Sequence, residues 1–165
     1  MGLDITPYQA LWFLPFVTPI CIWAAWSDLK YMKIRNMSVL AMVAVFLVVG
    51  LIALPFEDYL WRLVHIAVVL VIGFLMNMAR VMGAGDAKFA AAMAPFIALP
   101  DAGAFLLLLS VVMIAALATH RMFRAMPGFR ARTADWESWR VSKFPMGFAL
   151  GSALVFYLLM GTIPG

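Results

Sequence analysis

The chain has 165 residues, of which 66% are hydrophobic and 12% are charged, and its formal net charge at pH 7 is +4. A soluble globular domain usually carries about 25% charged residues, so this composition excludes an ordinary water-soluble domain. The mean hydropathy of +1.01 indicates an integral membrane protein instead. Cys21 is the single cysteine, which excludes an internal disulfide and a paired-cysteine zinc site.

Charged residues are segregated along the chain and leave long uncharged stretches between them. A helix needs about 20 apolar residues to cross ~30 Å of hydrocarbon, so these stretches predict an all-α polytopic membrane protein with about six transmembrane helices. The fourth stretch is short and contains Pro95, and we expect a short or kinked span there, or a re-entrant piece buried among the other helices. The six predicted spans are residues 8–26, 37–54, 61–79, 87–99, 102–119 and 144–163.

The positive charges distinguish the two sides of the membrane. Eleven of the twelve Lys and Arg residues fall in, or within two residues of, the loops after spans one, three and five, and Arg62 alone falls on the other side. The positive-inside rule therefore places these three loops in the cytoplasm and both termini outside. We expect residues 1–165 to form one integral membrane domain.

Asp28 lies at the cytoplasmic end of span one. Taken alone, it fits an ordinary juxtamembrane loop in which charges meet lipid headgroups. Asp86 follows Gly83-Ala84-Gly85 and precedes an alanine-rich run, where it is placed as the N-cap of a helix. The two glycines exceed what a cap requires, because they remove side chains where another backbone can approach closely. A short helix made largely of alanine can also pack tightly within a bundle.

The predicted topology brings Asp28 and Asp86 to the same side of the membrane. If spans one and four are neighbours, the two carboxylates face each other across a narrow gap. Two carboxylates in a poorly solvated site do not both ionise easily, so one keeps a proton. The ionised carboxylate can then activate a water while the protonated one polarises a peptide carbonyl. The helix start at Asp86 favours its ionised form, which makes Asp86 the better candidate for the base, although such a pair titrates as a unit.

The remaining polar residues suggest packing rather than chemistry. His65 and His120 are expected near opposite surfaces, so we predict no metal site and no cofactor. Asn77, near the inner end of span three, is expected to make an interhelical hydrogen bond. Gly147 and Gly151 form a G-x-x-x-G face, which indicates close helix packing.

The loop after span five is basic and aromatic. Positive-inside topology explains this composition better than nucleic-acid binding does, so we predict contact with membrane lipids and none with nucleic acid. In this interpretation the aromatic side chains that lie on an anionic membrane leaflet are Phe129, Trp136 and Trp139.

Three segments together resemble the type IV prepilin peptidases, which are membrane aspartic endopeptidases of the G-x-G-D kind. The segments are Asp28-Leu-Lys-Tyr-Met-Lys-Ile-Arg-Asn36, Gly83-Ala-Gly-Asp86-Ala-Lys88 and Lys143-Phe-Pro-Met-Gly147. The resemblance implies that Asp28 and Asp86 are the catalytic pair. It also implies supporting or substrate-binding roles for Gly83, Gly85, Lys88 and Asn36. The implied substrate is a pilin-like precursor whose basic leader is removed at the cytoplasmic face of a bacterial inner membrane.

Two departures from the family pattern refine this expectation. Arg35 stands where the first motif commonly has Pro, which leaves chemistry at Asp28 unaffected. The first cytoplasmic loop has no cysteine, whereas bifunctional members carry a cysteine-containing insert and also methylate the pilin. The chain therefore resembles the short, peptidase-only form of tight-adherence (Flp) pilus systems.

Two alternatives remain open from the sequence. One is an intramembrane aspartic protease for another substrate class, such as preflagellins or signal-peptide remnants. The other is a non-enzymatic scaffold or ion-relay subunit, because carboxylates near a bundle interior often serve transport. We further expect the two aspartates to stay out of hydrogen-bond contact until substrate arrives, while the oligomeric state is not defined by the sequence.

Overall fold

The computed structural model describes residues 2–141 and 143–163, and within these ranges it contains helices and no strand. The prediction of an all-α protein is therefore confirmed. The α-helices are α1 (Pro7–Tyr31), α2 (Asn36–Ala53), α3 (Phe56–Met78), α4 (Ala84–Met93), α5 (Ala102–Ala125), α6 (Pro127–Arg132) and α7 (Met146–Gly161). Three short 3-10 helices, η1 (Ala94–Phe96), η2 (Leu99–Asp101) and η3 (Glu137–Trp139), join them.

Four helical segments of the described chain are long and apolar enough to cross a membrane. They are α1, α2, α3 and the continuous stretch Leu99–Ala125, which contains η2 and α5. The ten residues of α4 extend about 15 Å, roughly half of the hydrocarbon core. The apolar helix α7, with 16 residues, is also shorter than a typical span. Six crossings and the placement of both termini outside thus stay predictions.

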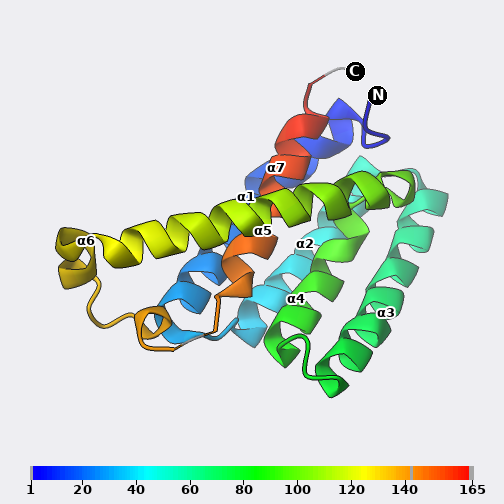
Figure 1. Ribbon diagram of the computed structural model, residues 1–165. Coiled ribbons are helices and arrows are strands. Elements are labelled where there is room, and N and C mark those ends of the chain that lie inside the picture. Colours follow the sequence, from blue (N-terminus) through cyan, green and yellow to red (C-terminus); the bar gives the residue numbers. More distant parts are fainter. Residues whose placement is uncertain (1, 142, 164–165) are drawn as a thin grey trace.

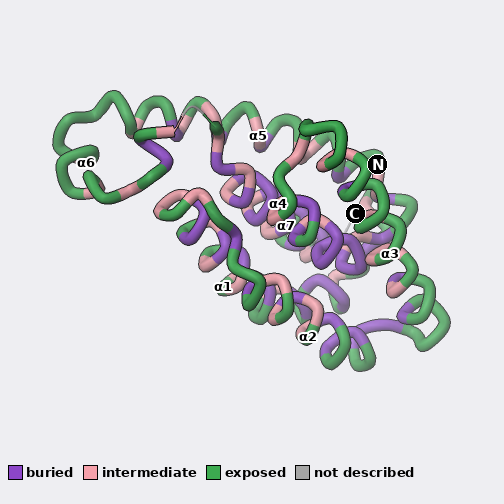
Figure 2. Tube along the Cα trace, turned by 90° about the horizontal axis from the view of Figure 1, so that it is seen from below, coloured by how far each residue is buried: buried purple, intermediate pink, exposed green. Residues whose placement is uncertain are grey.

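Helices α1 and α7 pack against each other in antiparallel directions along the centre of the molecule. Their contacts run from Gly161 against Ala10, through Gly151 against Cys21, to Gly147 against Asp28. A β-carbon at Gly151 would lie 3.1 Å from the Cys21 carbonyl oxygen, so the glycine allows the two backbones to approach closely. The predicted packing role of Gly147 and Gly151 is confirmed. Figure 2 shows α1 and α7 with much buried surface, whereas α3 and α5 are largely exposed.

The short helix α4 lies between α2 and α3 in Figure 1, with its alanine face buried. Gly73 of α3 makes room for it, since a β-carbon at that position would lie 2.8 Å from the Ala87 β-carbon. The prediction of Asp86 as N-cap is wrong by three positions, because the N-cap of α4 is Gly83 and Asp86 lies within the first turn. The turn therefore uses the glycine as its cap and places the carboxylate inside the helix.

A buried cluster of polar groups joins separate segments of the chain by hydrogen bonds at the end of the bundle opposite Asp28. The Asp101 carboxylate is 3% exposed. It accepts hydrogen bonds from the backbone N–H groups of Asp4 (2.8 Å) and Ile5 (3.0 Å) and from the Tyr157 hydroxyl (2.7 Å). The same hydroxyl accepts a hydrogen bond from the Ala98 N–H at 3.1 Å. One carboxylate thus joins the N-terminal segment, η2 and α7.

Replacing Tyr157 by Phe is expected to lower the free energy of unfolding by about 1–3 kcal/mol, because buried Asp101 and Ala98 each lose a hydrogen-bond partner. The ring, which packs edge-to-face on Phe105, is retained. Thermal unfolding of the purified protein in detergent measures the change. Tyr8→Phe, at a side chain that is 56% exposed, is the matched control; equal unfolding temperatures for both variants would contradict the expectation.

The connection between α5 and α7 folds into a small aromatic cluster. Trp139 is buried, stacks on His120 with ring centroids 4.7 Å apart, and donates from Nε1 to the Thr133 carbonyl at 2.9 Å. The prediction that Trp139 lies on a lipid leaflet is therefore wrong, because its indole N–H and ring are both used inside the loop. A salt bridge of 2.9 Å from Lys30 to Asp135 attaches this loop to the end of α1.

Candidate active site

Asp28 lies in the last turn of α1 and is 5% exposed. Its Oδ2 accepts a hydrogen bond of 2.7 Å from the backbone N–H of Gly147. Gly147 is the second residue of α7, and the first N–H groups of a helix have no partner within it. Asp28 supplies that partner from a separate helix, so the carboxylate is held in a fixed position between α1 and α7.

Asp86 is half-buried in the first turn of α4. Its Oδ2 lies over the Cα of Gly83, so closely that a β-carbon at position 83 would be 2.6 Å from it. Burial raises the pKa of Asp86 above its ordinary value, and the backbone amide of Gly83 opposes this by favouring the ionised form. At neutral pH the protonated fraction of this carboxyl is therefore larger than that of an exposed aspartate.

The fold brings the two aspartates into one site. Asp86 is close enough to Asp28 for a direct electrostatic interaction between the carboxylates. Among the hydrogen bonds of the described residues, none joins the two carboxylates, and their separation before substrate arrives stays a prediction. Both carboxylates face the start of a helix, Asp86 that of α4 and Asp28 that of α7. Proximity to a helix start, which favours the ionised form, therefore does not make Asp86 a better candidate for the base than Asp28.

The four predicted supporting residues fall in different places. Gly83 contacts Asp86 directly, whereas Gly85 packs on Ile34 of the α1–α2 connection. Lys88 is exposed on α4. Asn36, the first residue of α2, is exposed and lines a cavity together with Ser27, the residue before Asp28. Any role of these residues toward a substrate stays a prediction.

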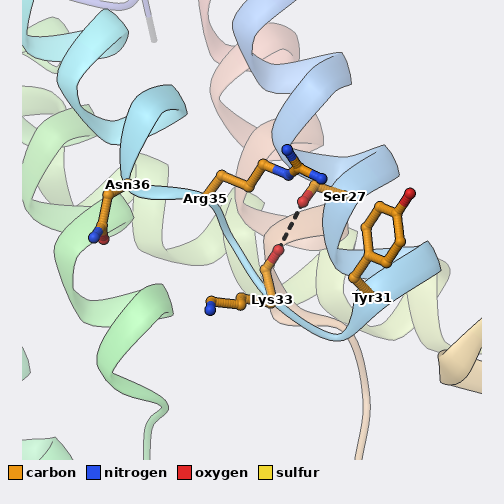
Figure 3. Close-up of a pocket in the computed structure, with 5 residues that line it drawn as sticks. All are labelled: Ser27, Tyr31, Lys33, Arg35 and Asn36. Atoms are coloured by element: carbon orange, nitrogen blue, oxygen red, sulfur yellow. Dashed lines mark hydrogen bonds between the residues drawn. The ribbon is translucent and has the colours of Figure 1, made fainter.

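The cavity has a volume of about 440 Å³ and a predominantly polar set of side chains. Figure 3 shows its five lining residues, Ser27, Tyr31, Lys33, Arg35 and Asn36. Ser27 directly precedes Asp28, is buried, and donates a hydrogen bond of 2.8 Å to the Lys33 carbonyl. The cavity therefore adjoins the end of α1 that carries Asp28, although neither Asp28 nor Asp86 lines it.

Two features of the site depart from the sequence analysis. Asn77 makes no interhelical bond; its side-chain amide donates to the Met82 carbonyl at 2.8 Å and so shapes the turn before Gly83. The G-x-x-x-G pattern indicates only a packing role for Gly147, although its N–H is the hydrogen-bond donor to Asp28. The signal that could have found this donor is the helix start after Pro145, where free N–H groups are expected.

Comparison with known proteins agrees with this arrangement. Residues 16–119 match the type IV leader peptidase family, a range that includes both aspartates and all four predicted supporting residues. Nothing among curated proteins and nothing among solved structures matches the chain significantly. Since the family match covers more than half of the sequence, the protein belongs to the type IV leader peptidase family.

Proposed function

We propose that this protein is an aspartic endopeptidase that removes the basic leader from pilin-like precursors at the cytoplasmic face of a bacterial inner membrane. The observation that carries the proposal is the juxtaposition of Asp28 and Asp86 at one end of the helical bundle, within the part of the chain that matches the leader peptidase family. Eleven of the twelve basic residues fall in, or within two residues of, the loops predicted to lie on that side.

The proposed reaction uses the two carboxyl groups as a pair. One ionised carboxylate removes a proton from water, and the resulting nucleophile attacks the scissile carbonyl carbon. The protonated partner donates a hydrogen bond to the carbonyl oxygen as negative charge develops on it. Collapse of the tetrahedral intermediate breaks the C–N bond, and the leaving amine receives a proton from the pair.

We propose further that the enzyme is the peptidase-only form associated with Flp pili. Only residues 32–35 connect α1 to α2, and this connection is too short to hold a folded insert. The lone Cys21 is buried within α1. We therefore expect cleavage of the precursor without methylation of the new amino terminus.

The test is cleavage of a purified pilin-like precursor by the purified protein in lipid nanodiscs, with products identified by mass spectrometry. The expected product is the mature chain, cut at the boundary between its basic leader and apolar helix and lacking a methyl group. Cleavage of a preflagellin or a signal-peptide remnant, but of no prepilin, would show that the substrate belongs to that class instead. If no precursor is cut, the ion-relay alternative is favoured, and proton flux into liposomes then becomes the measurement to make.

A further inference from the structure

We propose that Ile34 is a positioning residue that sets the separation between the Asp28 and Asp86 carboxylates. This inference rests on the proposed function, since it concerns the geometry of the same pair. Ile34 belongs to the connection between α1 and α2 and is 5% exposed. It contacts two glycines, one whose N–H holds the Asp28 carboxylate and one that directly precedes Asp86.

The side chain of Ile34 lies between the start of α7 and the start of α4. A β-carbon at Gly147 would be 2.9 Å from Ile34 Cδ1 and 3.0 Å from its Cγ1. A β-carbon at Gly85 would be 3.7 Å from Ile34 Cβ and 3.9 Å from its backbone nitrogen. The outer end of the isoleucine therefore packs tightly against the backbone that donates to Asp28, and its base lies beside Gly85, with room for one further carbon between them.

The connection that carries Ile34 is held to the end of α1 by two hydrogen bonds. Met32 adopts a left-handed conformation with φ 49°, and its N–H donates to the Asp28 carbonyl at 2.8 Å. Ser27 Oγ donates to the Lys33 carbonyl at 2.8 Å. Because these bonds begin in the last turn of α1, the isoleucine is fixed relative to Asp28. It can therefore act as a rigid spacer between the two helix starts.

The two contacts of Ile34 differ in how tight they are. A β-carbon at Gly147 would lie too close to Ile34, whereas one at Gly85 would make only ordinary contacts, so a change in volume at position 34 acts first on the start of α7. Removing the outer carbons of Ile34 leaves the first turn of α7 free to shift toward the connection. The Gly147 N–H moves with it, and the Asp28 carboxylate follows its donor.

The chain contains a matched control at the other end of α7. Ile5 is 2% exposed and packs on Gly161, whose β-carbon would be 2.7 Å from Ile5 Cγ2. Ile5 and Ile34 thus make equivalent isoleucine–glycine contacts with the two ends of one helix. Only Ile34 also contacts the helix start that carries Asp86.

The experiment compares Ile34→Ala and Ile5→Ala in nanodiscs, using precursor cleavage and thermal unfolding. Both variants are expected to unfold at lower temperature. Only Ile34→Ala is expected to lower kcat, by about tenfold or more with KM within about twofold, because misplacement by ~1 Å costs up to ~10²-fold in rate. Its bell-shaped pH–rate profile is expected to become narrower. Carboxylates that are farther apart interact less, so the two apparent pKa values of the pair move closer together. Ile34→Leu, which restores the volume, is expected to recover most of the rate.

Infrared titration of the carboxyl bands reports the same coupling without any substrate. If wild-type protein cuts no precursor, the proposed function fails, while a titration of Ile34→Ala that differs from wild type still supports the spacer. If Ile34→Ala does not fold, Ile34→Val, which removes Cδ1 alone, is expected to show the same changes to a smaller extent. Unchanged kcat, pH–rate profile and titration in the folded variant would overturn the inference, as would equal losses of kcat in Ile5→Ala.

Discussion

Replacing either Asp28 or Asp86 by Asn is expected to reduce kcat for precursor cleavage by about 10²- to 10⁴-fold, the range typical of general acid–base groups. An amide can neither take up the proton of the attacking water nor give a proton to the leaving amine. In the Asp28→Asn variant the side-chain carbonyl oxygen can still accept the Gly147 N–H, so the contact between α1 and α7 is retained. The double variant is expected to be about as slow as either single one, because residues that act as a unit lose their effect together.

Single-turnover cleavage followed by gel electrophoresis provides the measurement, with thermal unfolding recorded in parallel. Asp58→Asn is the matched control, since Asp58 is an exposed aspartate in the first turn of α3 and is expected to be replaced without loss of rate. Cleavage at the wild-type rate by either single variant would contradict the carboxylate-pair mechanism. Multiplicative losses in the double variant would show that the two residues act independently.

Gly83→Ala is expected to lower kcat by about tenfold or more while changing stability by only about 1 kcal/mol or less. The backbone at Gly83 has φ −69° and ψ 147°, which alanine adopts without strain, so conformational freedom does not require the glycine. The new β-carbon would instead lie 2.6 Å from Asp86 Oδ2. The carboxylate must rotate away from position 83, which changes its position relative to Asp28.

Gly85→Ala distinguishes this explanation, the contact between position 83 and Asp86, from the one drawn from the sequence, in which both glycines make room for another backbone. A β-carbon at Gly85 would make only ordinary contacts, 3.7 Å from Ile34 Cβ, and alanine is the better helix former within α4. We therefore expect wild-type stability or better and a smaller loss of kcat than in Gly83→Ala. The reverse order of the two losses would indicate that the glycines make room for a substrate backbone.

The sequence predicted the helical fold well because hydrocarbon imposes strong demands on composition. The uncharged stretches at 37–54 and 102–119 lie within long apolar helices, as expected. The prediction was less accurate at 87–99, where apolar content alone does not reveal that the α-helix ends at Met93 and continues into η1. Apolar content also does not reveal that Asp101 joins the N-terminal segment to α7, since hydrogen-bond partners 97 residues apart leave no local pattern.

Within the candidate site, the residues were predictable and their arrangement was not. Asp28 and Asp86 could be paired because charge segregation placed them on one side of the membrane. The three-residue error at Asp86 arose because both Gly and Asp are good N-cap residues, and the choice between them depends on packing against α3. The roles of Ile34 and Gly147 depend on interhelical distances of a few ångströms, which sequence periodicity does not define.

The hydrogen bond from Gly147 to Asp28 joins residues 119 positions apart, and this separation has a consequence for biogenesis. Ribosomes add about 5–20 residues per second, so roughly 6 to 24 s pass between synthesis of the aspartate and synthesis of its donor. During that interval α1 through α5 can already occupy the membrane, but the Asp28 carboxylate lacks its partner. A nascent chain arrested before α7 therefore carries both aspartates of the candidate site but lacks the donor that holds Asp28.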